Sequence, residues 1–199
     1  MTTTNFPTGK YQIILADPPW KYHLRVNDST HRNRIPYPSM TNEEILQLPE
    51  NVIAAHDSYL FLWATKDHLR LAFDCVVNWG FTYKNTFTWL KVAQNGRPHI
   101  STGHWGRNCT EFLLIGARGK AKCFTSLGIT NQPTIITAPR GKHSQKPMES
   151  FDFIHRVADA VDANTPQDRI ELFARVAQPN WSAWGNELPN QQVFTEIED

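Results

Sequence analysis

One short run of the sequence carries side chains that could hold and activate a flat amine. It consists of Asp17, Pro18, Pro19 and Trp20, called here the Asp17–Trp20 turn. Two successive prolines fix the backbone and lack N–H donors, so this segment offers mainly carbonyl acceptors. The carboxylate of Asp17 adds another acceptor, and the indole of Trp20 can stack on a ring. We therefore expect the turn to receive a planar ring that bears an NH2 group.

The chemistry predicted for this turn is transfer of a methyl group onto that amine. The lone pair of an aromatic amine is delocalised into its ring, which makes the nitrogen a poor nucleophile. Acceptors at Asp17 and at the Pro18 carbonyl would pull its hydrogens out of the ring plane, so that the lone pair can point at a sulfonium methyl. Pro19 and Trp20 complete the predicted catalytic set. No metal is expected, because the sequence lacks an H-E-x-x-H motif and paired cysteine spacing.

The elements that must position this turn alternate between strand and helix. Apolar runs predict strands over residues 11–16, 58–65, 81–92, 110–116, 169–173 and 181–184. Helices are predicted from residue 42 (with Thr41 and Glu44 as a capping box), over 67–79, and over 147–160 with Pro147 as the first helical residue. This order predicts an α/β fold, with a mostly parallel sheet and helices on both faces. Without repeats or an obvious boundary, residues 1–199 are expected to form a single domain.

Three further motifs follow the Asp17–Trp20 turn in the chain: residues 143–147 (His-Ser-Gln-Lys-Pro), 170–175 (Ile-Glu-Leu-Phe-Ala-Arg) and 184–187 (Trp-Gly-Asn-Glu). Together the four motifs resemble the DPPW-type N6-adenine methyltransferases. That family includes the catalytic subunit that makes N6-methyladenosine in messenger RNA, and small bacterial and phage DNA adenine methyltransferases. The resemblance covers nearly the whole chain. It implies a Rossmann-like S-adenosylmethionine-dependent methyltransferase fold with the permuted, beta-type motif order, in which the catalytic motif precedes the cofactor motifs.

The resemblance also implies where the cofactor binds. S-adenosylmethionine is the expected cofactor and S-adenosylhomocysteine the product. Lys146 matches the lysine that meets the methionine carboxylate, and Asp17 lies near the same end of the cofactor. The residues implied around the ribose and adenine come from the last two motifs: Arg175, Asn186 and Glu187. Phe173, at the end of the expected cofactor strand, is a further implied cofactor-binding residue. Residues 176–178 depart from the messenger-RNA enzyme, whose longer segment carries cofactor contacts that have no counterpart here.

Basic side chains are concentrated in two long loops, at about residues 17–40 and 93–108. The net charge of +1 is small for a protein that binds nucleic acid by bulk electrostatics, so these loops carry the prediction of a nucleic-acid surface. An adenine in a duplex must be flipped out before its N6 is reachable, and we expect both loops to clamp phosphates meanwhile. The expected nucleic-acid contacts are Lys21, Arg25, Arg32, Arg34, Arg97, Trp105 and Arg107. Three other tryptophans are predicted to be core residues: Trp63, Trp79 and Trp89.

These features predict an enzyme that methylates the N6 amine of adenine in DNA, an adenine-specific DNA methyltransferase. DNA is expected over RNA because the chain has no zinc finger, RNA-binding module or long basic tail. An RNA N6-adenosine methyltransferase and an inactive nucleic-acid-binding subunit are the alternatives, and a homodimer stays open. Protein glutamine methyltransferases resemble N-P-P-Y rather than D-P-P-W. No run of about 18 apolar residues and no signal peptide is found, so no membrane contact is expected. The expected location is the cytoplasm of a bacterial or phage-infected cell.

Overall fold

A computed structural model of the chain describes residues 6–21, 40–49, 53–101, 103, 105–141, 145–186, 188 and 192–194. These residues form one eight-stranded sheet in the order β5-β3-β4-β2-β1-β6-β7-β8. The strands are β1 Tyr11–Ala16, β2 Ala54–Ala64, β3 Thr82–Val92, β4 Thr110–Arg118, β5 Ile135–Pro139, β6 Arg169–Leu172, β7 Ser182–Trp184 and β8 Gln192–Phe194. The helices are α1 Asn42–Leu46, α3 Leu69–Asn78, α4 Met148–Ala160 and the 3-10 helix η1 Phe124–Leu127.

Six of the strands point the same way, and only β4 and β8 of the described sheet run against them. β1 is parallel to both β2 and β6, β6 to β7, and β3 to β5, whereas β4 is antiparallel to β2 and β3, and β8 to β7. The mostly parallel sheet predicted from the sequence is therefore confirmed. The reversed direction of β4 was not predicted, because an apolar run carries no information about the direction of its strand.

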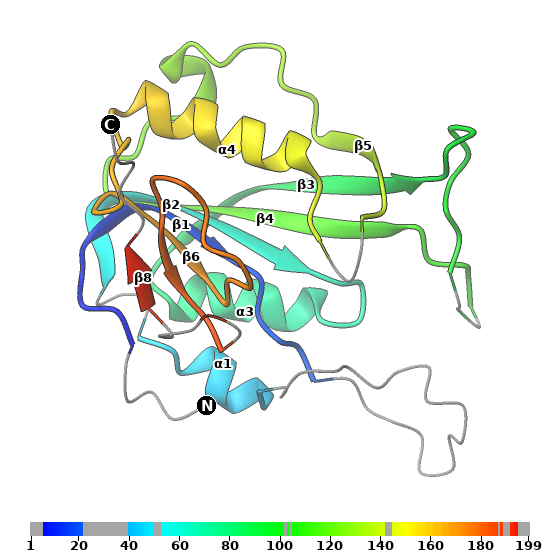
Figure 1. Ribbon diagram of the computed structural model, residues 1–199, viewed down its shortest axis with the longest axis horizontal. Helices are drawn as coiled ribbons and strands as arrows, with labels where there is room; N and C mark the ends of the chain where they lie inside the picture. The colour runs from blue at the N-terminus through cyan, green and yellow to red at the C-terminus, as the bar shows by residue number, and fades with distance from the viewer. Residues whose placement is uncertain are drawn as a thin grey trace.

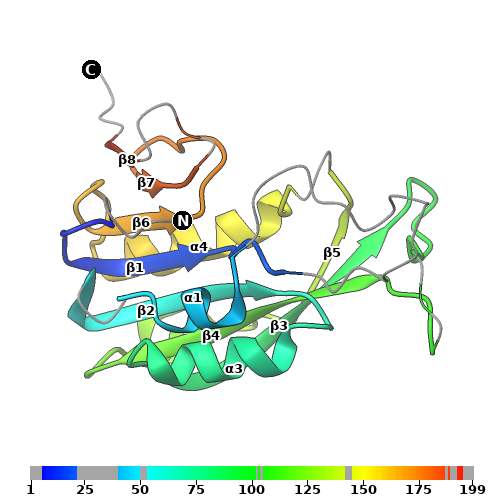
Figure 2. The ribbon, with the colours of Figure 1, turned by 90° about the horizontal axis from the view of Figure 1, so that it is seen from below.

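Helices cover both faces of the sheet, as Figures 1 and 2 show, with α4 on one side and α1 and α3 on the other. Side chains of a strand alternate between its two faces, so each strand contributes to two cores. On one face, Ile14 of β1 shares a buried cluster with Val76 of α3. On the other, Phe61 of β2 meets Phe153 of α4 edge-on, with ring centroids 6.0 Å apart. This arrangement confirms the predicted layers.

The predicted helix start is confirmed at α1, whereas α4 and α3 begin one and two residues later than predicted, at Met148 and Leu69. Thr41 and Glu44 form the predicted capping box at α1, because the Glu44 N–H donates to Thr41 Oγ1 at 3.1 Å and the Thr41 N–H donates to Glu44 Oε2 at 2.7 Å. Pro147 was predicted to be the first helical residue of α4. Its extended ψ of 142° makes it the N-cap instead, and the helix begins at Met148. No helix in the described ranges is both long and apolar enough to cross a membrane.

Candidate active site

The Asp17–Trp20 turn begins at the centre of the sheet, where β1 ends between two parallel neighbours. Ala16, the last residue of β1, is level with Leu62 of β2 and with Leu172 of β6. The Asp17 N–H donates to the carbonyl oxygen of Leu172 at 3.4 Å. Ligands of open α/β sheets bind just beyond the carboxyl ends of such strands. The fold therefore puts the turn at the edge where a ligand site is expected.

Backbone hydrogen bonds hold the turn in one shape. The Trp20 N–H donates to the Pro18 carbonyl at 2.8 Å, and the Met40 N–H donates to the Pro19 carbonyl at 3.2 Å. A carbonyl oxygen has two lone pairs, so the Pro18 oxygen keeps one for an amine hydrogen of a substrate. Both prolines are buried. The acceptor predicted at Pro18 is thus present, although it already serves the turn itself.

The indole of Trp20 lies in the core and does not offer the open stacking face expected from the sequence. Only 4% of Trp20 is exposed, and its Nε1–H donates to the carbonyl oxygen of Trp63 at 3.2 Å. The imidazole of His68 is stacked on the indole, with ring centroids 5.4 Å apart and planes 14° apart. Stacking of Trp20 on a substrate ring therefore stays a prediction. The large apolar ring is buried against β2 and the start of α3, and His68 covers its face.

Four charged side chains of alternating sign meet beside the turn. Lys146 Nζ lies 2.9 Å from Asp17 Oδ1 and 2.9 Å from Glu111 Oε2. The other oxygen of Glu111, Oε1, lies 2.5 Å from Lys91 Nζ. The sequence had assigned Asp17 and Lys146 to one site, and the structure brings them together. Glu111 and Lys91 were missed, although a charged residue within an apolar strand run is a signal, since burying an unpaired charge is costly.

Burial and charge shift the pKa values of this network in different directions. Burial raises the pKa of Asp17, and the nearby Glu111 carboxylate adds to the rise while Lys146 opposes it. Burial alone would lower the pKa of Lys146, but Asp17 and Glu111 outweigh it and hold that pKa well above its usual value. Burial would likewise raise the pKa of Glu111, but Lys146 and Lys91 lower it overall. Lys146 is therefore a permanent cation, and Glu111 a permanent anion, at neutral pH.

Two core tryptophans lie beneath the two lysines. Lys146 Nζ is 5.3 Å from the ring centroid of Trp63, and Lys91 Nζ is 4.9 Å from that of Trp89. The two indoles meet edge-on, with centroids 6.1 Å apart. A cation over an indole face is stabilised by the quadrupole of the ring. All three tryptophans predicted to be core residues are at most 1% exposed: Trp63, Trp79 and Trp89.

The end of β6 departs from ordinary strand geometry where the cofactor was expected. Phe173, the residue after β6, has a φ of +64°, a left-handed conformation that is rare and strained for an aromatic residue. It turns the chain sharply at a position where many cofactor strands end in a glycine loop. The charge of Arg175, two residues on, is close enough to lower the pKa of Asp17. Lys146, Phe173 and Arg175 thus all lie near the end of β1.

Glu171 in β6 is a further acid, partly buried, which belongs to one of the motifs but was given no role from the sequence. Its Oε2 is buried and has no hydrogen-bond partner among the described residues. Burial raises its pKa to about 8, with the Asp17 carboxylate adding to the rise and Lys146 opposing it. An acid kept largely neutral in this way can accept a cationic ligand by releasing its proton.

These residues fit S-adenosylmethionine. An amino-acid carboxylate needs a cation such as Lys146, and an ammonium needs an acceptor such as the unpartnered oxygen of Glu171. Trp63 Nε1 is a second buried atom without a partner in the described part of the chain, and it is a donor. A side chain at Gly185 would put Cβ 2.1 Å from the Ala174 carbonyl oxygen, so glycine lets the segments after β6 and β7 pack closely. Asn186 follows, exposed.

The predicted nucleic-acid residues are partly described. Residues 93–109, called here the arm, join β3 to β4 and extend beyond the sheet on the right of Figure 1. Trp105 is fully exposed on the arm, and Arg97 and Arg107 are exposed as well. Lys21 is exposed directly after Trp20. Four predicted site residues lie outside the described ranges: Arg25, Arg32, Arg34 and Glu187.

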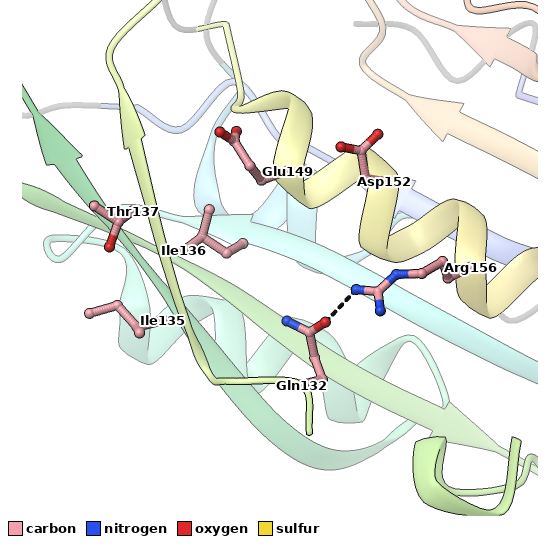
Figure 3. A pocket seen from close by; sticks show the side chains of 7 residues that line it. All are labelled: Gln132, Ile135, Ile136, Thr137, Glu149, Asp152 and Arg156. Carbon is pink, nitrogen blue, oxygen red and sulfur yellow. Dashed lines mark hydrogen bonds between the residues drawn. The ribbon is translucent and has the colours of Figure 1, made fainter. Parts of the chain in front are cut away.

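A hollow of about 400 Å³ lies elsewhere, between β5 and α4 (Figure 3). Ile136, Glu149 and Asp152 help to line it, and Arg156 donates a hydrogen bond to Gln132 at its end. None of the predicted site residues lines this hollow. No group of three or more His, Cys, Asp or Glu in the described residues could hold a metal ion, and metal-free chemistry stays a prediction.

The sequence pattern of the MT-A70 family matches this chain over residues 11–187. The chain belongs to the MT-A70 family. The type II methyltransferase M.MunI of Mycoplasma sp. is 32% identical over 204 residues, which cover 94% of this chain and 82% of M.MunI. The N(6)-adenosine-methyltransferase catalytic subunit METTL3 of Homo sapiens is 32% identical over 184 residues, or 90% of this chain and 28% of METTL3. The MT-A70-like N(6)-adenosine-methyltransferase of Drosophila melanogaster is 31% identical, with 27% of its length covered.

The resemblance stated from the four motifs is therefore confirmed, and the chain is an MT-A70 methyltransferase. It spans most of M.MunI but little more than a quarter of METTL3. The match begins at β1 and runs through the last cofactor motif, so the MT-A70 region includes the turn, the charge network and β6.

Proposed function

We propose that this MT-A70 protein transfers a methyl group from S-adenosylmethionine to the N6 amine of adenine in DNA. One observation carries the proposal: the Asp17 carboxylate lies at the carboxyl end of the central strand and is held there by the largely buried side chain of Lys146. When bound, the cofactor supplies an electrophilic methyl group. The protein supplies position and charge, which account for most of the catalysis in such displacements.

Each residue of the site has a defined task in this proposal. Asp17 and the Pro18 carbonyl accept the two amine hydrogens, which directs the nitrogen lone pair out of the ring plane. Lys146 orients the Asp17 carboxylate and has a third N–H for the methionine carboxylate. Glu171 accepts from the methionine ammonium. Glu111 keeps Lys146 between two acids, so that the lysine has a fixed position before any ligand arrives.

DNA is proposed as the substrate because one observation favours it over RNA, and a second supports binding of a nucleic acid of either kind. M.MunI, a type II methyltransferase, is matched over most of its length, whereas the N(6)-adenosine-methyltransferases are matched over about a quarter. The arm brings Arg97, Trp105 and Arg107 to the edge at which β1, β2 and β3 end, and no acidic residue interrupts residues 93–109. Basic groups can hold phosphates, and an exposed indole can stack on an unpaired base.

The test is to incubate the chain with S-adenosylmethionine and either plasmid DNA or RNA, digest the products to nucleosides, and measure N6-methyladenine by mass spectrometry. We expect the modified nucleoside from DNA, and none from an Asp17→Ala control. Methylation of RNA alone would reject DNA in favour of the METTL3-like alternative. If neither polymer is methylated although calorimetry shows cofactor binding, the proposed substrate is wrong. If the cofactor does not bind, the chain is an inactive subunit.

A further inference from the structure

His68 contacts the Asp17–Trp20 turn from the start of α3, whereas Lys146 precedes α4, which covers the other face of the sheet. It lies between the end of β2 and the start of α3, where it is the N-cap residue, and only 7% of it is exposed. Its ring covers the face of Trp20. A buried histidine against an aromatic ring can be ordinary core packing, so its polar contacts decide what it does.

Both ring nitrogens of His68 are engaged, and their partners fix the tautomer. Nε2 lies 3.0 Å from the carbonyl oxygen of Lys21, the residue that follows the turn. A carbonyl only accepts, so Nε2 carries the hydrogen and donates it. Nδ1 then accepts from the hydroxyl of Thr65, the residue after β2, at 2.9 Å. Thr65, directly after β2, therefore holds the imidazole at one nitrogen. At the other nitrogen the imidazole holds Lys21, the residue that follows the turn.

Because Trp20 is hydrogen-bonded to Pro18, a restraint on the position of Trp20 also restrains the prolines. Its Nε1–H is bound to Trp63 in β2, and its backbone N–H is bound to the Pro18 carbonyl, the acceptor proposed for the substrate amine. A sideways shift of the indole would move that carbonyl with it. Stacking by His68 and its hydrogen bond to Lys21 block such a shift from two directions.

We propose that His68 is a positioning residue for the Asp17–Trp20 turn: it fixes the indole of Trp20 and thereby the Pro18 acceptor. The inference rests on the proposed function, in which that acceptor binds the amine only in the geometry needed for transfer. The cofactor side of the site, built from Lys146, Glu171 and Arg175, does not depend on His68. Loss of His68 should therefore slow transfer without weakening cofactor binding.

Two variants separate the two kinds of contact. His68→Phe keeps a stacked ring and removes both hydrogen bonds, whereas His68→Gln keeps a donor and removes the ring. His56→Ala is the control, because His56 also lies in the β2 region and its side chain is 84% exposed. We expect kcat to fall about tenfold to a hundredfold in both His68 variants, since misplacement by about 1 Å can cost that much. The dissociation constant of the cofactor should stay within about twofold, because its binding groups keep their positions.

A second readout does not depend on the substrate. Hydrogen exchange of the Trp20 indole N–H, assigned by NMR with a Trp20→Phe reference, reports whether the ring stays bound to Trp63. We expect faster exchange in both His68 variants and no change in His56→Ala. If the wild type methylates an amine other than adenine N6, the proposed function fails, but kcat on that amine and the exchange rate still test the role of His68.

Two results would overturn the inference. Wild-type kcat in folded His68→Phe and His68→Gln proteins would show that neither the hydrogen bonds nor the stacked ring positions the turn. A parallel fall of kcat, cofactor affinity and melting temperature, with indole exchange unchanged relative to other core amides, would reduce His68 to a stabilising core residue.

Discussion

The Nζ of Lys146 lies 2.9 Å from Oδ1 of Asp17, so the residue that precedes the N-cap of α4 holds the carboxylate that follows β1. The contact joins the Asp17–Trp20 turn to the motif at residues 143–147 directly, through a half-buried ion pair. Because Glu111 shares the same lysine, neither acid can change without affecting the other.

Replacement of Asp17 tests the core of the mechanism. Asp17→Asn keeps one acceptor oxygen and the shape of the side chain but removes the charge, whereas Asp17→Ala removes the acceptor. We expect kcat to fall about a hundredfold or more in both, by comparison with the loss of one preorganised polar group in other enzymes. Single-turnover kinetics and a melting curve are the measurements. Near-normal turnover by a folded Asp17→Ala protein would contradict the mechanism.

Replacement of Lys146 should weaken cofactor binding. A charge-assisted hydrogen bond contributes about 1.5–3 kcal/mol, so Lys146→Ala should raise the dissociation constant of S-adenosylmethionine about tenfold or more by calorimetry. Removal of the lysine also leaves Asp17 and Glu111 buried without their shared cation, so the melting temperature should fall. Lys91→Ala is the matched control, because Lys91 binds the other oxygen of Glu111. If both variants bind the cofactor like the wild type, Lys146 is not a cofactor ligand.

Glu171 predicts an unusual pH dependence of stability. Its pKa rises from 4.5 to about 8 on folding, because burial disfavours the carboxylate. Between these values the folded chain keeps a proton that the unfolded chain releases, so this group makes the free energy of unfolding decrease as pH rises. Glu171→Gln removes that effect. The melting temperature of the variant, relative to the wild type, should therefore increase from about pH 5 to about pH 8.

Bound cofactor should reverse the difference in melting temperature between Glu171→Gln and the wild type at about pH 8. If Glu171 accepts from the methionine ammonium, saturating S-adenosylmethionine at about pH 8 should raise the melting temperature of the wild type more than that of Glu171→Gln. An equal rise in both proteins would mean that Glu171 is a buried acid without a ligand.

The arm should supply salt-dependent binding. Replacement of Arg97 and Arg107 by Ala should weaken DNA binding and flatten the plot of log affinity against log salt by about 0.9 for each phosphate that is no longer neutralised. Trp105→Ala should lower affinity with little change in slope, because stacking is not ionic. Lys120→Ala and Lys122→Ala, beyond the opposite end of β4, serve as controls. A slope that stays the same in the arginine variant would make those arginines ordinary solvated charges.

The order of strands and helices could be predicted because each apolar run ends at a clear local signal. Thr41 with Glu44 marked the start of α1, and Gly80 marked the end of α3. Strand β5, residues 135–139, was missed because it is short and half exposed, so its hydrophobic pattern is weak. The direction of β4 depends on its long-range pairing with β2 and β3, which local periodicity does not encode.

The site could be predicted where a single residue type carries the chemistry. Asp17 was identified in this way, whereas Lys146 was assigned because residues 143–147 resemble a family motif. The burial of Trp20 was not predicted, because the partner that stacks on it, His68, comes from a different element and belongs to no motif. The charge of Glu111 within an apolar run was a signal, but its pairing with Lys146 depends on the antiparallel β4 and could not be predicted. The strained turn at Phe173 has no signature in residue type.

The position of β6 beside β1 has a consequence for how the protein is made. A ribosome releases β1 and the Asp17–Trp20 turn early, but β6, residues 169–172, emerges after five other strands of the sheet. Until then the central strand lacks one of its two parallel neighbours, and Glu171 and Arg175 are still absent from the site. A nascent chain that stops before β6 would contain the complete Asp17–Trp20 turn and Lys146, but not the residues at the end of β6 that are proposed to complete the cofactor site. In the proposed mechanism, methyl transfer therefore requires that the ribosome has already released β6.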